Sequence, residues 1–189
     1  MGNIREPLPV KLIASMFTTE RGLFEVAREK LVERLGPVGY ESELLPFEHT
    51  DYYTPEFGEN LVREFVAFGR LIDPGRLAEI KRFTNALEME LAVEGKRRIN
   101  IDPGYVSLSK LVLATTKNYS HRMYLGGGIY AEVTLRFRKG SFEPWEWTYP
   151  DYASREYCEL FNRIRELYVE QLRPYSTLTN SKTGSPPRS

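Results

Sequence analysis

The chain has 189 residues, of which 41% are apolar, 13% aromatic and 28% charged. This composition can build a hydrophobic core, so it excludes disorder over the whole chain, and the length predicts one globular domain. The 26 basic and 26 acidic side chains balance, which argues against a protein that coats DNA or an anionic membrane. The single cysteine excludes an internal disulfide, and no apolar run reaches the ~18 residues that span a bilayer. We therefore expect a cytoplasmic protein.

The charges are unevenly distributed along this neutral chain. Residues 1–94 carry a net charge of −6, and residues 95–189 carry +6. Most of the imbalance comes from an acidic segment, residues 41–64 with net −6, and a basic segment, residues 96–139 with net +7. The two segments can neutralise each other, or they can leave a gap that holds a phosphate group. The sequence leaves both alternatives open.

The first half of the chain predicts two strand and helix units. Short apolar runs indicate strands, and apolar residues spaced three or four apart indicate helices. In chain order the predicted elements are a strand at 10–17, a helix at 23–35, strands at 38–47 and 61–72, a helix at 74–91 and a strand at 98–101. We expect Thr18 or Thr19 to cap the first helix, Asp73 to cap the second and Gly95 to end it.

The second half predicts hairpins and a final helix. Asp102-Pro103-Gly104 is typical of a turn, and residues 106–116 favour a short helix over a strand. Apolar and polar residues alternate over 129–138, which predicts a strand. Gly126-Gly127-Gly128 would join it to residues 122–125, with Leu125 opposite Ile129, Tyr124 opposite Tyr130 and Arg122 opposite Glu132. A strand at 142–147 and a helix from Ser154 to Pro174 follow.

These elements predict an α+β fold with a mostly antiparallel sheet. The order strand, helix, strand, strand, helix, strand is that of a ferredoxin-like βαββαβ core. C-terminal β-hairpins and a terminal helix would extend this core. We expect an N-terminal arm at 1–9, a single domain at 10–174 and a disordered tail at 175–189.

Candidate site residues occur in both charged segments. In the basic segment, Lys117, His121 and Arg122 combine a point charge, a titratable imidazole and a bidentate guanidinium, which suits phosphate binding. The carboxylates suit metal binding or general acid–base chemistry. We take Asp51, Glu56 and Asp102 as candidate metal ligands, and candidate catalytic residues are Asp51, Glu56, Asp102, His121 and Glu132.

Several stretches resemble a family of bacterial and archaeal proteins known as domain of unknown function 4416. They span residues 10–172 and include Thr50-Asp51-Tyr52-Tyr53, Asn100-Ile101-Asp102-Pro103-Gly104-Tyr105, His121-Arg122-Met123-Tyr124-Leu125 and Trp147-Thr148-Tyr149-Pro150-Asp151-Tyr152. Phe57 stands where the family pattern usually has Met. Some members are labelled "GTP-binding protein", so the resemblance implies nucleotide binding. The sequence contains neither a phosphate loop of the form Gly-x-x-x-x-Gly-Lys-Ser/Thr nor an Asn-Lys-x-Asp motif.

Three functions remain as hypotheses. In the first, the protein binds a nucleotide, GTP included, or another phosphorylated small molecule, with Mg²⁺ accompanying a nucleotide; whether it is an enzyme is left open. In the second, it is a non-catalytic interaction module whose opposite charges neutralise each other. In the third, the sheet binds RNA through Tyr124, Tyr130, Arg136 and Arg138. The absent RNA-reading motif counts against nucleic acid. The sequence does not indicate an oligomeric state, and we expect no membrane partner.

Overall fold

The computed structural model describes residues 3–47 and 54–180. It has an α+β architecture built on one open sheet of nine strands, in which every pair of neighbours is antiparallel. In chain order the elements are β1 (Val10–Thr18), α1 (Gly22–Leu35), β2 (Val38–Glu41), β3 (Leu45–Pro46), α2 (Thr54–Phe57), β4 (Val62–Ile72), the 3₁₀ turn η2 (Pro74–Arg76), α3 (Leu77–Glu90), β5 (Asn100–Val106), β6 (Lys110–Thr115), β7 (Met123–Gly126), β8 (Ile129–Arg138), β9 (Ser141–Pro144) and α4 (Arg155–Asn180).

The strands follow the order β2-β4-β1-β5-β6-β8-β7, with β3 paired to β4 and β9 paired to β8. The central strand β1 is hydrogen-bonded to β4 on one side and to β5 on the other, and all nine of its residues are buried. This explains why residues 10–18 are mostly apolar and do not alternate with polar residues, because a strand covered on both faces has no solvent side.

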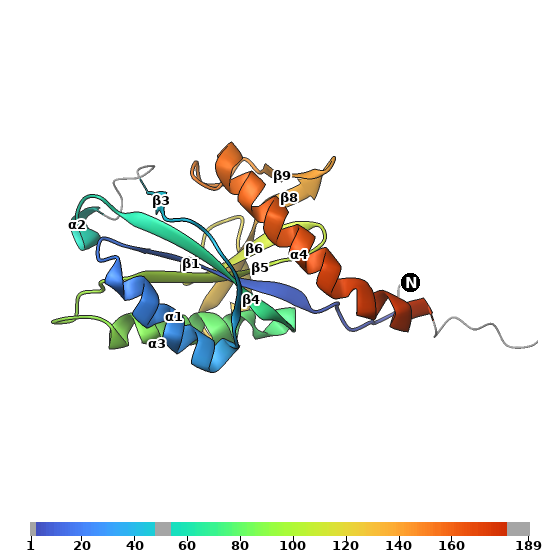
Figure 1. Cartoon of the computed structure of the whole chain (residues 1–189), viewed down its shortest axis with the longest axis horizontal. Coiled ribbons are helices and arrows are strands. Elements are labelled where there is room, and N and C mark those ends of the chain that lie inside the picture. The colour runs from blue at the N-terminus through green and yellow to red at the C-terminus, as the bar shows by residue number, and fades with distance from the viewer. Residues whose placement is uncertain (1–2, 48–53, 181–189) are drawn as a thin grey trace, which may run out of the picture.

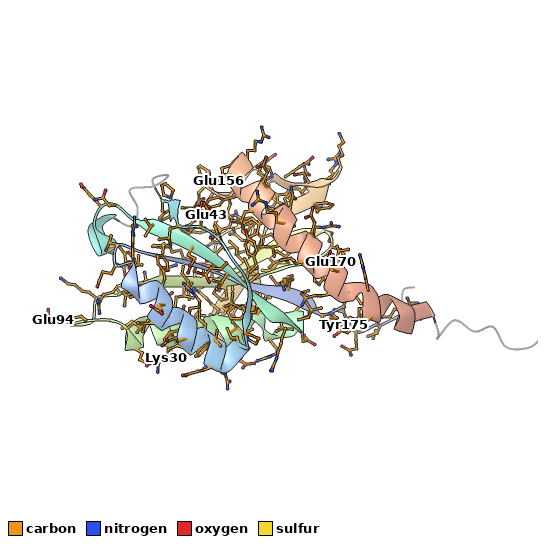
Figure 2. The ribbon with its side chains drawn as sticks, viewed as in Figure 1. Lys30, Glu43, Glu94, Glu156, Glu170 and Tyr175 are labelled. Atoms are coloured by element: carbon orange, nitrogen blue, oxygen red, sulfur yellow. The ribbon has the colours of Figure 1, made fainter. Side chains whose placement is uncertain are left out.

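Helices cover both faces of the sheet. Figure 1 shows α1 and α3 side by side on one face, while α4 crosses the other. The first face is sealed by alternate residues of β1, such as Leu12 and Met16, against Leu31 of α1 and Ile80 of α3. The core on the α4 face contains a group of aromatic residues around Phe65, packed among aliphatic side chains. In Figure 2 the side-chain sticks are densest between these layers, and the labelled side chains of Lys30 and Glu156 point outward.

Several local predictions about the first half of the chain are corrected. Neither Thr18 nor Thr19 caps α1, whose N-cap position is Arg21. The Thr18 hydroxyl instead donates to the Arg98 carbonyl at 2.6 Å. The predicted strand at 38–47 is two short strands, and α3 ends at Glu90 with Leu91, not Gly95, as its C-cap. Asp73 does act as predicted, since its carboxylate accepts a hydrogen bond from the Gly75 amide at 2.6 Å.

Three predictions about the second half of the chain are also corrected. Asp102-Pro103-Gly104 is not a turn but lies within β5, with Pro103 opposite Ala14 of β1. The segment expected to be a short helix forms the buried strand β6. The terminal helix does not stop at Pro174 but continues to Asn180.

The glycine hairpin forms, but its turn is shorter than predicted. The β7–β8 register pairs Tyr124 with Tyr130 as expected and places Gly126, not Leu125, opposite Ile129. The turn residues Gly127 and Gly128 have φ angles of 60° and 78°. Two successive positive φ angles favour glycine strongly and give the turn that suits a two-residue hairpin.

A charged cluster with one buried member, Glu64, lies where α1 packs against β4. The Glu64 side chain is 3% exposed, and its Oε1 is 3.1 Å from Nη2 of Arg28. Nη1 of the same arginine is 3.0 Å from Oε1 of Glu41, so one guanidinium lies between two carboxyl groups. Burial raises the pKa of Glu64 to about 7, and the hydrogen bond it shares with Glu41 adds to the rise, although the charge of Arg28 opposes both.

No helix within residues 3–47 and 54–180 is long and apolar enough to cross a membrane.

Candidate functional site

The sheet splits between β5 and β6. Hydrogen-bonded pairing joins these strands only from Gly104 opposite Leu113 to Val106 opposite Leu111. Beyond this ladder, residues 100–103 of β5 pair with β1, while Ala114 and Thr115 of β6 pair with β8. At the last shared pair the strands are very close, because a Cβ on Gly104 would lie 2.3 Å from the Val112 carbonyl oxygen. The two strands then separate.

A cavity of about 470 Å³ lies at this split. Its walls come from the first residues of β5, the end of β6 with the loop that follows, one face of α3 and residues 149–152 before α4. Sites for small organic ligands have volumes of about 300–1,000 Å³. The cavity is therefore large enough to hold a ligand of nucleotide size.

Asp102 and Lys81 form an ion pair where β5 meets α3. Lys81 Nζ donates to Asp102 Oδ1 at 2.7 Å and to the Ile101 carbonyl at 3.0 Å, and Asn100 Nδ2 donates to Asp102 Oδ2 at 2.7 Å. Burial alone would raise the pKa of Asp102, but the charge and hydrogen bond of Lys81, together with the Asn100 amide, hold it below its usual value. Asp102 is therefore a carboxylate at neutral pH.

Arg97 links this pair to two more carboxylates. Its Nε and Nη2 donate to the two oxygens of Glu56 at 2.7 and 2.8 Å, a bidentate arrangement. Its Nη1 donates to Glu88 Oε2 at 2.9 Å and to Asn100 Oδ1 at 3.0 Å. Burial raises the pKa of Glu88, whose other oxygen accepts the Ile101 amide at 2.6 Å. The hydrogen bond to Glu56 raises the pKa of Arg97.

Arg63 and Asp151 form a buried ion pair at another wall of the cavity. Both side chains are almost fully buried, and Arg63 Nη1 contacts Asp151 Oδ2. The guanidinium carbon lies 3.8 Å from the centre of the Phe47 ring and also faces the ring of Tyr152. Asp151 accepts the Tyr152 amide as well, at 2.8 Å. This pair anchors residues 149–152, which line the cavity.

Arg122 also lines the cavity, and it pairs with Glu132, the residue predicted to lie opposite it in the hairpin. Its Nε donates to Glu132 Oε2 at 2.7 Å, and its Nη1 donates to the Lys117 carbonyl at 3.1 Å. The guanidinium carbon lies 4.4 Å from the centre of the Tyr119 ring. These contacts fix the loop between β6 and β7, on which Lys117 and Tyr119 line the cavity.

All but two of the site residues predicted from the sequence line this cavity. Glu56, Asp102, Lys117, Arg122 and Glu132 all line the cavity. His121 does not line it, because its imidazole stacks on Trp147 with ring centres 5.6 Å apart. Its Nε2 still lies 3.1 Å from Glu132 Oε2. Asp51 lies outside the described residues.

The acidic and basic segments neutralise each other only in part. Glu56 of the acidic segment pairs with Arg97 of the basic segment. Glu41 and Glu64 pair with Arg28 of α1 instead, and Arg122 pairs with Glu132 within the basic segment.

Among residues 3–47 and 54–180 no group of three or more metal-ligating side chains is found. Two candidate metal ligands, Glu56 and Asp102, are bonded to cationic side chains.

Sequence reasoning missed half of the charged residues in this site. Lys81 and Glu88 are only 4% and 3% exposed, yet they lie on a helix where charged residues usually face water. Their spacing of seven residues places them on one side of α3, next to its apolar stripe. That spacing was the available signal, but a solvent-facing pair gives the same pattern. Arg63, Arg97 and Asp151 gave no local signal.

The fold and the site define an α+β protein with a charged cavity between two separating strands of an antiparallel sheet. The family model described as "Domain of unknown function (DUF4416)" matches residues 8–168. The chain therefore belongs to the DUF4416 family. No curated protein and no solved structure matches the chain.

Proposed function

We propose that this protein binds a phosphorylated small molecule, such as a nucleotide, in the cavity between β5 and β6. The observation that carries the proposal is convergence: Glu56, Asp102, Lys117 and Arg122 come from distant parts of the chain and line one cavity of about 470 Å³. Surface charges that serve only solubility have no reason to gather around a concave site. Clefts lined with charged groups of perturbed pKa are typical of functional sites.

The cationic side chains retain donors for an anion. Lys81 uses two of its three N–H groups, on Asp102 and Ile101. Arg122 uses Nε and Nη1, and its Nη2 makes no hydrogen bond among the described residues. A guanidinium has five N–H donors, so a phosphate can be bound without breaking these ion pairs. The unused donors therefore favour an anionic ligand.

The rings at the cavity suit a ligand that also has a planar part. Tyr119 and Tyr149 line the cavity and remain 49% and 47% exposed. Exposed aromatic rings next to cationic groups are the elements that bind bases and phosphates in nucleotide sites. Mg²⁺ would arrive with the nucleotide, because Glu56 and Asp102 are already bonded to Arg97 and Lys81.

Thermal-shift measurements on the full chain test the proposal. The probes are ATP, GTP, ribose 5-phosphate and pyrophosphate, each at millimolar concentration with and without Mg²⁺. We expect at least one probe to raise the Tm, and we expect Lys117→Ala and Arg122→Ala to weaken that rise. Arg138→Ala is the matched control, since Arg138 lies at the far end of β8 and does not line the cavity. If no probe shifts the wild type, the proposal is wrong.

A ferredoxin-like core is part of the same proposal. The two βαβ units contribute β1, β2, β4 and β5, and these strands lie in the order β2-β4-β1-β5. In chain order this is second, third, first and fourth, the arrangement expected of a split βαβ fold.

A reducing cytoplasm is the setting we propose, because the one cysteine, Cys158, is buried and unpaired.

A second candidate function is self-association through the sheet edge at β7. Met123, Tyr124 and Leu125 are 62%, 63% and 43% exposed, and the strand carries no charge. At the opposite edge, Glu41 at the end of β2 and Pro46 in β3 discourage pairing. Two copies of β7 can pair antiparallel about a two-fold axis without opposing like charges. Analytical ultracentrifugation tests this: a monomer at 100 µM, or a dimer that Tyr124→Lys leaves intact, contradicts it.

RNA binding by the sheet is less favoured than either of these functions, because Arg136 is already paired with Glu143.

A further inference from the structure

Some polar groups of the cavity have no hydrogen-bond partner within residues 3–47 and 54–180, and they are not the groups that sequence reasoning selected. Four cationic side chains of the cavity each form an ion pair with a carboxylate: Arg63, Lys81, Arg97 and Arg122. The carboxylates Glu56, Asp102, Glu132 and Asp151 are their partners. These pairs set the charge of the cavity, but they are present whichever ligand enters. Selection between ligands of similar charge therefore needs other groups.

Asn85 is such a group. It lines the cavity from α3, is half-buried, and its carboxamide makes no hydrogen bond within the described part of the chain. It follows Lys81 by four residues and precedes Glu88 by three, so the three polar residues lie on one side of the helix. Lys81 and Glu88 are both held in place by hydrogen bonds to β5. The helix backbone that carries Asn85 is therefore fixed relative to the cavity.

The chemistry of a carboxamide limits what it recognises. An asparagine presents a donor and an acceptor side by side, and it pairs best with a group that presents an acceptor and a donor in return. A purine base edge and a sugar with neighbouring hydroxyl groups both do so. A bare phosphate or pyrophosphate has no such neutral face. The hydroxyls of Thr116, Tyr119 and Tyr149 at the cavity also make no hydrogen bond with the described residues, but they lie on loops rather than on a helix.

We propose that Asn85 is the specificity-determining residue of this site, where its carboxamide hydrogen-bonds the neutral, donor-and-acceptor part of a phosphorylated ligand. The inference rests on the proposed function, because it needs a ligand in the cavity. It assigns different parts of the ligand to different residues. Arg122 and its neighbours hold the anionic part of any ligand, and Asn85 distinguishes a nucleotide or sugar phosphate from a simple phosphate.

The test compares two variants against two kinds of probe by isothermal titration calorimetry on the full chain. Asn85→Leu keeps the approximate size of the side chain and removes its hydrogen bonds. It should weaken binding of the tightest organic probe, a nucleotide or ribose 5-phosphate, about threefold to tenfold, the value of one neutral hydrogen bond. It should leave pyrophosphate binding unchanged. Arg122→Ala should weaken both.

Each outcome separates the two proposals. If the wild type binds an organic probe and Asn85→Leu binds it equally well, the role of Asn85 is wrong while ligand binding stands. If Asn85→Leu weakens pyrophosphate as much as the organic probe, the residue does not select and the inference fails. If the wild type binds no probe, both proposals fail. A preference for nucleotides over ribose 5-phosphate that is lost in Asn85→Leu assigns the contact to the base, and an equal loss for both assigns it to the sugar.

Discussion

Replacing Glu64 by glutamine should remove most of a pH dependence of stability that this carboxyl group creates. The group is buried between Arg28 and Glu41, and its pKa is raised from 4.5 to about 7. In the unfolded chain it ionises near its ordinary value. Between these two pH values the folded protein holds a proton that the unfolded chain has released, so the free energy of unfolding falls as the pH rises. Above pH 7 both states are ionised and the loss is complete.

The magnitude follows from the size of the rise in pKa. One pKa unit corresponds to about 1.4 kcal/mol, so a rise from 4.5 to about 7 corresponds to about 3 kcal/mol. A glutamine at this position is uncharged at every pH. The difference in free energy of unfolding, wild type minus Glu64→Gln, should therefore decrease by about 3 kcal/mol between pH 4.5 and pH 8. Most of the decrease should occur before pH 7.

Urea denaturation followed by circular dichroism at half-unit steps of pH measures this difference. Glu59→Gln is the matched control, since Glu59 is an exposed carboxyl group near the start of the same strand, and its difference from the wild type should stay nearly constant. Glu41→Gln should move the fall toward lower pH, because it removes the second carboxyl group that raises the pKa of Glu64. A wild-type minus Glu64→Gln difference that is flat, or that increases with pH, would refute the reasoning.

Two further substitutions test the walls of the cavity. Arg63→Met leaves Asp151 buried without its cation, and we expect a loss of about 3–5 kcal/mol in the free energy of unfolding; a loss below about 1 kcal/mol in urea denaturation would contradict the buried pair. Gly104→Ala places a methyl group 2.3 Å from the Val112 carbonyl oxygen, and we expect a loss of about 1–3 kcal/mol and a lower Tm. Its control is Gly22→Ala in α1, where a Cβ meets nothing within 4 Å, so that variant should be as stable as the wild type or more stable.

Sequence reasoning predicted the elements whose residues carry a clear local pattern or capping signal. The alternation at 129–138 became β8, and the turn residues Asp73 and Pro74 began the second helical segment where expected. It failed at β6, because Leu111–Ala114 are buried on both faces and a short apolar run without alternation does not distinguish strand from helix. It failed again at Asp102-Pro103-Gly104, where turn-forming residues lie inside a strand.

Sequence reasoning selected cavity residues mainly from loops and the hairpin, and it missed those within α3 and β4. Charge clustering selected Lys117 and Arg122 near the hairpin, and these residues do line the cavity. Lys81 and Arg63 could not be selected in this way, because each lies beside other charged residues in an otherwise ordinary helix or strand, and nothing in the sequence shows that it is buried. What gives them a place in the cavity is the separation of β5 from β6, a property of tertiary pairing that no local pattern records.

The two sides of the cavity differ in how firmly the sheet holds them. Asp102 sits opposite Ser15 of β1, a strand that is hydrogen-bonded along both edges and covered on both faces. The facing side ends in residues 116–122, a loop fastened chiefly by Arg122. Amide protons of β1 should therefore be among the last to exchange with solvent, and those of the loop among the first. A ligand in the cavity would therefore contact a rigid wall on the β5 side and an adaptable wall at the loop of residues 116–122. We expect this loop, rather than β5, to move when ligands of different size bind.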